Sequence, residues 1–236
     1  MARASEKKLM KRGILDSLPF LVVLIPFAML FGVVGTEAGL NIAQVMGFSV
    51  VVIAGAAQFT ALQLLQEGAP VAIVLLTALA VNLRMAMYSA ALTPHLGQAP
   101  FWQRGLVAYL IVDQNFAIAA TAYERETQWS LADRMAYFIG VSIPVVPAWY
   151  AFTLLGVLVG ATLPEWLALD FALPVAFLSI VAPALRTLAH VAAAAVSVVL
   201  ALCFAFLPYS IGLLIAGLGA MMAGAQVEKI MERGNG

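Results

Sequence analysis

Hydrophobic positions run in long uninterrupted segments along this chain, separated by short stretches that hold turn residues and most of the charges. About 20 apolar residues in a helix span the hydrocarbon core of a bilayer. A helix also satisfies its own backbone hydrogen bonds in lipid. The apolar segments cover residues 14–35, 42–65, 70–93, 104–122, 135–161, 171–185, 188–206 and 209–226. The pattern therefore predicts an all-α polytopic membrane protein with seven to eight transmembrane helices.

Proline residues fall inside several of these segments, including Pro26 in the first and Pro144 in the fifth. The segment 171–185 is the shortest, and it either spans or re-enters the membrane. Helices interrupted in both halves of a chain are typical of transporters built from repeats. We therefore predict some Pro/Gly-broken helices and consider an internal repeat. Residues 25–32 and 143–150 are loosely alike, but both would run in the same direction, so an inverted repeat needs another pairing.

The composition supports a membrane protein with one integrated domain. Apolar residues make up 64% and charged residues 10%, whereas soluble domains have about 25% charged residues. The mean hydropathy is +1.00. We expect a basic tail at 1–13, a helical bundle at 14–226 and a second tail at 227–236. The net charge of zero gives no reason to expect a nucleic-acid partner, so the lipid bilayer is the expected surrounding.

The distribution of basic residues predicts the orientation. With eight spans and a cytoplasmic N-terminus, ten of the twelve Lys and Arg residues lie on the cytoplasmic side. Arg84 is then inside the membrane, and Arg104 is the one basic residue on the far side. Cytoplasmic loops carry an excess of Lys and Arg, so the distribution favours cytoplasmic N- and C-termini.

Two charged residues interrupt apolar segments that are neighbours in the sequence. Arg84 lies within residues 70–92, and Asp113 lies within residues 105–122. A charge at the centre of a membrane helix costs roughly 2.5–3.5 kcal/mol on insertion scales. Such a residue needs water, a partner or the interior of a bundle. The two opposite charges therefore predict one polar centre inside the protein.

Either of two roles fits Arg84. It pairs with Asp113 to hold helices together, or it binds the carboxylate of a substrate, whose geometry matches the forked donors of a guanidinium. Asp113 in turn neutralises Arg84, binds a substrate ammonium group, or carries a proton if burial raises its pKa.

Further polar residues lie close to these charges in the sequence. Gln58 follows small residues that favour close helix packing, and it either makes an interhelical hydrogen bond or lines a substrate site. Asn82 and Tyr88 flank Arg84, and Asn115 follows Asp113. Because a regular helix cannot turn residues 113–115 to one side, that helix is locally unwound or its polar residues reach several neighbours.

Sites for metals, cofactors and catalysis are not expected. No cluster of His, Cys and Glu has metal-ligand spacing, and Cys203 lies alone in an apolar segment. The chain offers neither paired aspartates nor a Ser–His dyad for an intramembrane enzyme. We therefore predict a non-enzyme without a metal or cofactor.

Several of these motifs together resemble a known family. They are Asp16-Ser-Leu-Pro-Phe20, Gly55-Ala-Ala-Gln-Phe59, Asn82-Leu-Arg-Met-Ala-Met-Tyr88, Val112-Asp-Gln-Asn-Phe116 and Asp170-Phe-Ala-Leu-Pro174. In this order they resemble the AzlC family, the large subunit of the branched-chain amino-acid exporter (LIV-E) type. The resemblance covers most of the chain, from about residue 13 to residue 186.

The resemblance implies a multi-pass exporter of branched-chain or related apolar amino acids, such as methionine, in the cytoplasmic (inner) membrane of a prokaryote. It also implies a small membrane partner of the AzlD type. The expected substrate-binding residues are Gln58, Asn82, Arg84, Tyr88, Asp113 and Asn115. The alternative is a non-transporting channel or scaffold subunit, in which Arg84 and Asp113 only join helices.

Overall fold

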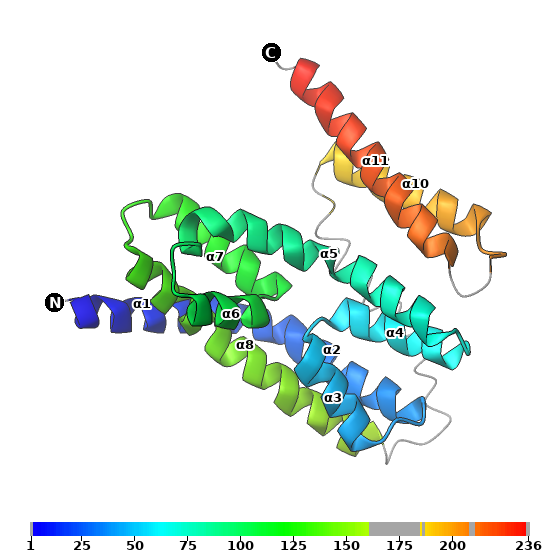
Figure 1. Cartoon of the computed structure of the whole chain (residues 1–236), viewed down its shortest axis with the longest axis horizontal. Coiled ribbons are helices and arrows are strands. Elements are labelled where there is room, and N and C mark those ends of the chain that lie inside the picture. Colours follow the sequence, from blue (N-terminus) through cyan, green and yellow to red (C-terminus); the bar gives the residue numbers. More distant parts are fainter. Residues whose placement is uncertain (1, 161–184, 186, 208–210, 235–236) are drawn as a thin grey trace. The chain divides into compact units, whose positions relative to one another are not determined.

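The computed structural model describes residues 2–160, 185, 187–207 and 211–234 (Figure 1). This described part is helical and contains no strand, which confirms the all-α class. The predicted segment 171–185 lies outside the described residues except for Leu185. The chain divides into two compact units, one formed by Met1–Phe59 with Val81–Glu165 and the other by Thr60–Ala80 with Trp166–Gly236. Each unit is described by itself.

Long apolar helices dominate both units. Among the described residues, four are long and apolar enough to cross a membrane: Ser5–Glu37, Val71–Leu96, Leu131–Gly160 and Ile211–Met231. The first of these consists of α1 (Ala2–Ser17), a 3-10 turn (η1, Leu18–Phe20) and α2 (Leu21–Glu37). The other three belong to α5 (Val71–Leu96), α8 (Leu131–Gly160) and α11 (Ile211–Gly234).

Prolines do not break the long helices. Pro26 lies inside α2, and Pro144 and Pro147 lie inside α8. Pro19 lies in the 3-10 turn between α1 and α2. Helices are broken, as predicted, but the breaks lie at residues 53–54 and 111–112 rather than at these prolines.

The first long helix and α8 run side by side in the same direction (Figure 1). Two reciprocal glycine contacts fix this pairing. A Cβ atom on Gly13 would meet the carbonyl of Tyr137, and one on Gly140 would meet the carbonyl of Met10. Gly32 and Gly156 make the equivalent contacts further along both helices. Small residues let helix backbones approach this closely in membrane proteins.

The predicted span 42–65 is not one helix. It consists of α3 (Ile42–Val52) and α4 (Gly55–Gln66), separated at Ile53, which has the left-handed φ of 40°. A β-branched residue rarely adopts such a conformation. The prediction of one continuous span is therefore wrong here, and the break is held by contacts described below.

The predicted span 104–122 is broken as well, into α6 (Phe101–Leu110) and α7 (Asp113–Arg125). Ile111 and Val112 between them are extended. Of the two alternatives for residues 113–115, the structure has the unwound helix, with the break directly before Asp113. The three polar residues then form the first turn of α7.

Aromatic contacts show that α3 and α4 form a hairpin. Along α3, Val45 lies against Gly35 of α2, and three residues later Phe48 packs on Phe31, with ring centroids 6.4 Å apart. The chain thus runs antiparallel to α2. After the break, Phe59 of α4 packs between Phe27 and Phe31. The beginning of α4 therefore runs back in the direction of α2, and the hairpin re-enters the unit from the end where α2 finishes.

A second hairpin, formed by α6 and α7, enters from the opposite end. Three successive contacts pair α7 with α5 in parallel: Asp113 with Arg84, Phe116 with Tyr88, and Tyr123 with His95. Because only four residues separate Leu96 of α5 from Phe101 of α6, the hairpin starts where α5 ends. The breaks of the two hairpins meet in one buried cluster, which contains both Ile53 and Val112.

This arrangement corrects the predicted position of Arg104. Arg104 lies near the start of α6, at the end of the unit where α5 and α7 finish. Arg12 pairs with Glu126 directly after α7, so the N-terminal basic residues lie at this end too. Arg125 and Arg134 also lie there. The second hairpin does not cross the unit, so Arg104 is not on the far side from the N-terminal basic residues. Within the first unit, this end therefore carries one basic residue more than the eight-span prediction gave it.

The second unit contains the helix pair α10 (Leu188–Cys203) and α11. The side chain of Thr187 caps α10 by accepting a hydrogen bond from the backbone N–H of His190. Gly219 and Gly224 of α11 face Leu200 and Ala193 of α10. The predicted helices at 188–206 and 209–226 are thus present.

Candidate substrate site

Arg84 and Asp113 form an ion pair in the first unit. The distance from Nη1 of Arg84 to Oδ2 of Asp113 is 3.0 Å, and the two side chains are 31% and 42% exposed. Arg84 lies midway along α5, and Asp113 is the first residue of α7. A carboxylate is favoured there because the N-terminus of a helix carries a partial positive charge. The structure thus joins the two charges that the sequence placed in neighbouring segments.

Hydrogen-bonding atoms without a partner occur on this ion pair and on residues two positions away from each of its members in the chain. Within the described residues, six buried side-chain nitrogen or oxygen atoms lack a hydrogen-bond partner. Four of these atoms belong to Asn82, Arg84, Asp113 and Asn115, which we call the polar centre. They comprise one donor, Nε of Arg84, and three acceptor oxygens. Buried polar atoms are normally paired, so this concentration indicates a place prepared for a polar ligand or water.

Asn115 holds the second break closed. Its side-chain amide donates to the carbonyl of Leu110 at 2.7 Å and to Oγ of Ser142 on α8 at 3.0 Å. Leu110 is the last residue of α6, so this bond satisfies a carbonyl that the break leaves free. Its Oδ1 remains without a partner in the described part of the chain.

Gln58 has the corresponding place in the first hairpin. It is fully buried, accepts a hydrogen bond from the backbone N–H of Ala54 and donates to Oγ of Ser49. Ser49 in turn lies 3.5 Å from the hydroxyl of Thr153 on α8. The structure gives Gln58 this role in the break, and its contact with a substrate stays a prediction.

Tyr88 connects the polar centre to an aromatic contact. Its ring stacks on Phe116 with centroids 4.1 Å apart and planes at 10°. It lies close enough to Arg84 and Asp113 to interact electrostatically with both. Asp113 and Asn115 therefore lie in the second hairpin, with Arg84 and Tyr88 against it. Asn82 lies two residues before Arg84 on α5, and Gln58 lies in the first hairpin.

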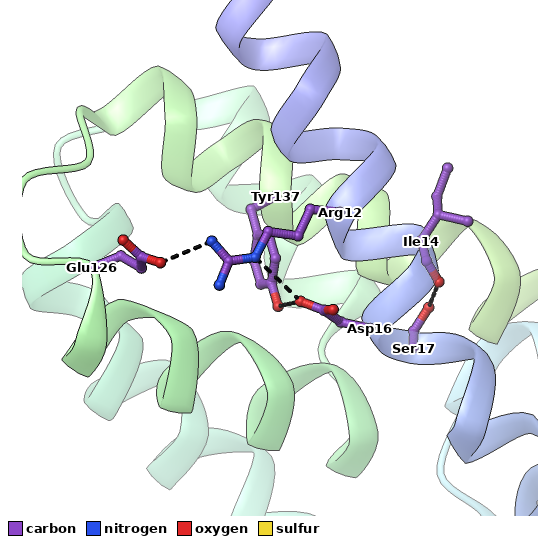
Figure 2. A network of polar contacts seen from close by, with 6 residues as sticks. All are labelled: Arg12, Ile14, Asp16, Ser17, Glu126 and Tyr137. Carbon is purple, nitrogen blue, oxygen red and sulfur yellow. Dashed lines mark hydrogen bonds and ion pairs between the residues drawn. The ribbon is translucent and has the colours of Figure 1, made fainter.

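A second polar network, which the sequence analysis missed, joins α1 to α8 and to the loop before it (Figure 2). Arg12 donates to Glu126 at 2.8 Å and lies 3.7 Å from Asp16, which accepts a hydrogen bond from Tyr137 at 2.7 Å. Arg12 also stacks over the ring of Trp129. The only signal in the sequence was Asp16, which begins the first of the resembling motifs.

Metal binding finds no support among the described residues, which contain no group of three or more His, Cys, Asp or Glu side chains able to hold an ion. A cavity of about 210 Å³ lies between α5 and α6. Its walls are mainly apolar, with Arg104 among the lining residues.

Comparisons with known proteins agree with the resemblance. A family model described as AzlC protein matches residues 19–163. An uncharacterized membrane protein of Archaeoglobus fulgidus is 28% identical over 237 residues, covering 95% of this chain and 98% of that protein. The inner membrane protein YgaZ of Escherichia coli K12 is 30% identical over 174 residues, covering 71% of this chain and 69% of that protein. No solved structure matches the chain. The matched range contains both hairpins and the whole polar centre.

Proposed function

The chain belongs to the AzlC family of membrane proteins, and from this premise we propose that it exports branched-chain or related apolar amino acids, such as methionine, from the cytoplasm. Membership of the family is consistent with a multi-pass membrane transporter. The choice of substrate is the proposal, and it rests on the resemblance together with the chemistry of the polar centre.

The observation that carries the proposal is the set of unsatisfied donors and acceptors beside a partly exposed ion pair. An α-amino acid carries one carboxylate and one ammonium group. Nε of Arg84 offers a donor to the carboxylate, and the free oxygens of Asp113 and Asn115 offer acceptors to the ammonium. The charges of the substrate and of the polar centre are therefore complementary. When no substrate is bound, Arg84 and Asp113 pair with each other.

The location of the site supports transport by alternating access. Discontinuous helices near the bilayer midplane form the substrate sites of many transporters, and their N-termini carry partial positive charge. Here both α4 and α7 begin at breaks that meet within the first unit. Non-helical backbone is tolerated at membrane depth only where protein or a water-filled cavity surrounds it.

The proposal includes an orientation and a partner. The end of the first unit that carries Arg12, Arg104, Arg125 and Arg134 would face the cytoplasm, with the protein in the inner membrane of a prokaryote. A small AzlD-type membrane subunit would bind this chain, as the resemblance implies. Exposed apolar residues on α5, such as Leu83 and Met87, would contact lipid or that subunit.

Counterflow in liposomes tests this function. The purified protein is reconstituted with and without the small subunit and loaded with unlabelled leucine, and uptake of labelled leucine, valine and methionine is measured across a pH gradient. We expect saturable uptake of these amino acids and none of glutamate or lysine, whose side-chain charges would lack partners. Absence of uptake of every amino acid with the subunit present would refute the proposal.

A scaffold role is the second candidate, and the 3.0 Å ion pair favours it, since such a pair could simply join α5 to α7. Exchanging the charges, with Arg84→Asp and Asp113→Arg together, separates the two roles. A scaffold would keep its fold and any activity of its complex. A transporter would fold but lose counterflow, because the donor for the carboxylate would move to the other helix.

A further inference from the structure

The break after α3 leaves a backbone carbonyl that must find a new partner. In a continuous helix, the carbonyl of Val50 would accept a hydrogen bond from the N–H of Ala54. Here the N–H of Ala54 donates to the side chain of Gln58 at 3.2 Å. The N–H of Ile53 donates to Ser49. Val50 therefore loses its helical partner, and a backbone carbonyl left without a partner is costly in a membrane protein.

Tyr109 supplies the missing partner from the other hairpin. Its hydroxyl donates to the carbonyl of Val50 at 2.8 Å. The hydroxyl of Tyr150 on α8 lies 2.8 Å from the hydroxyl oxygen of Tyr109. A tyrosine hydroxyl has one hydrogen, and that of Tyr109 goes to Val50. Tyr150 is therefore the donor in the second bond, and both bonds meet on the oxygen of Tyr109.

The second hairpin has no such dependence. The carbonyl of Leu110 at its break is satisfied by Asn115 of the same hairpin. Asn115 also donates to Ser142 of α8. The free carbonyl at one break is thus satisfied within its own hairpin, while the free carbonyl of Val50 at the other break is satisfied by a residue of the opposite hairpin.

We propose that Tyr109 is a positioning residue that couples the two hairpins. The first hairpin cannot move away from the second without breaking the hydrogen bond from Tyr109 to Val50. No hydrogen bond or ion pair joins Tyr109 to Arg84 or Asp113 in the described part of the chain, and Tyr109 acts through the backbone at Val50. The coupling itself follows from the hydrogen bonds alone. Its consequence for transport rests on the proposed function, because alternating access requires one or both hairpins to move.

Two matched variants test the coupling. Tyr109→Phe removes the bond to Val50, and Tyr150→Phe removes only the neighbouring hydroxyl and leaves that bond intact. Both changes delete one oxygen and keep the ring. Hydrogen–deuterium exchange of the full chain in lipid nanodiscs then reports the backbone amides of residues 51–57. This measurement needs no substrate.

We expect Tyr109→Phe to raise exchange at residues 51–57 by roughly two- to tenfold, the effect of losing one hydrogen bond. Tyr150→Phe should leave exchange there within about twofold of the wild type, because the bond from Tyr109 to Val50 persists. Equal exchange in the wild type and Tyr109→Phe would overturn the proposal. Failure of Tyr109→Phe alone to fold would also overturn it, in favour of a purely structural role.

Leucine counterflow by the same variants measures the consequence. Tyr109→Phe should change the maximal rate and leave the half-saturation concentration unchanged, because the polar centre is untouched. A change in half-saturation without a change in rate would place Tyr109 at the substrate and contradict coupling. If the wild type fails to transport leucine, the proposed function fails while the exchange result stands.

Discussion

The two hairpins have the same plan and different chemistry. Each begins its returning helix at a break, and each has a buried amide next to a phenylalanine, Gln58-Phe59 in one and Asn115-Phe116 in the other. Each phenylalanine packs on an aromatic ring of a preceding long helix, Phe27 of α2 or Tyr88 of α5. The hairpins enter from opposite ends, which is the arrangement of an inverted repeat.

The difference lies in the first turn after each break. The first hairpin has Gly55 and two alanines. The amide oxygen of Gln58 accepts a hydrogen bond from Ala54, and its amide nitrogen donates one to Ser49. The second has Asp113, Gln114 and Asn115, with a charge and two unpaired oxygens. The comparison teaches that two hairpins of similar plan can have different roles, with one serving as an apolar support and the other carrying the polar chemistry.

The largest loss of transport is expected from substitution of Arg84, which pairs with Asp113 of the second hairpin. Arg84→Ala should reduce leucine counterflow by roughly ten- to a hundredfold, because it removes the donors to the substrate carboxylate, and hydrogen bonds to charged groups contribute about 1.5–3 kcal/mol. Arg84→Lys keeps the charge but not the forked donors, and it should retain little activity. Initial counterflow rates, normalised to the amount of inserted protein, measure both. Equal loss of protein in both variants would favour the scaffold role.

Replacing each amide by leucine sharpens the comparison. Gln58→Leu leaves the N–H of Ala54 and the hydroxyl of Ser49 without their partner, and should lower stability by about 1–3 kcal/mol. The half-saturation concentration for leucine should stay unchanged. Asn115→Leu should cost similar stability and also weaken leucine binding, because Oδ1 of Asn115 faces the ligand in the proposed site.

Thermal unfolding in nanodiscs and counterflow at several leucine concentrations separate these effects. A raised half-saturation in Gln58→Leu equal to that in Asn115→Leu would show that both hairpins hold the substrate. The assigned division of roles between the hairpins would then be wrong.

A smaller effect is expected at Tyr88. Tyr88→Phe keeps the stack on Phe116 and removes a hydroxyl close to the ion pair, so it should change counterflow by less than about tenfold. Tyr88→Leu removes the stack as well, an aromatic interaction worth about 0.5–1.5 kcal/mol, and should be the more damaging. Counterflow measured at several leucine concentrations compares the two variants. A larger loss in Tyr88→Phe than in Tyr88→Leu would assign the role of Tyr88 to its hydroxyl.

The smallest effect concerns the network of Figure 2, which lies outside both hairpins. Arg12→Gln removes a partly exposed ion pair, and such pairs contribute at most about 1 kcal/mol. The melting temperature should fall by roughly 2–4 °C, with counterflow unaffected. Glu126→Gln should have a smaller effect, because Arg12 keeps its contacts with Asp16 and Trp129, and the double variant should add little to Arg12→Gln. A large loss of transport would assign this network to the transport cycle.

Much of the architecture could be predicted from the sequence. Long apolar segments predicted helices, and the basic N-terminal residues predicted one positively charged end. Arg84 and Asp113 were recognisable because a charge in an apolar segment is costly and needs a partner. The three polar residues from Asp113 onward gave a break there as one of two alternatives. The small residues beside Gln58 predicted only close helix packing, and the break near them was missed.

Sequence alone determined that this chain is a helical membrane protein with two opposite charges inside its apolar segments, since hydropathy and charge are properties of the residues themselves. Only the tertiary structure decided that the segments at 42–65 and 104–122 reverse rather than cross. Their apolar residues would suit either path. The reversals depend on long-range bonds, such as that from Tyr109 to Val50, and no local pattern records a hydrogen bond between residues so far apart in the chain.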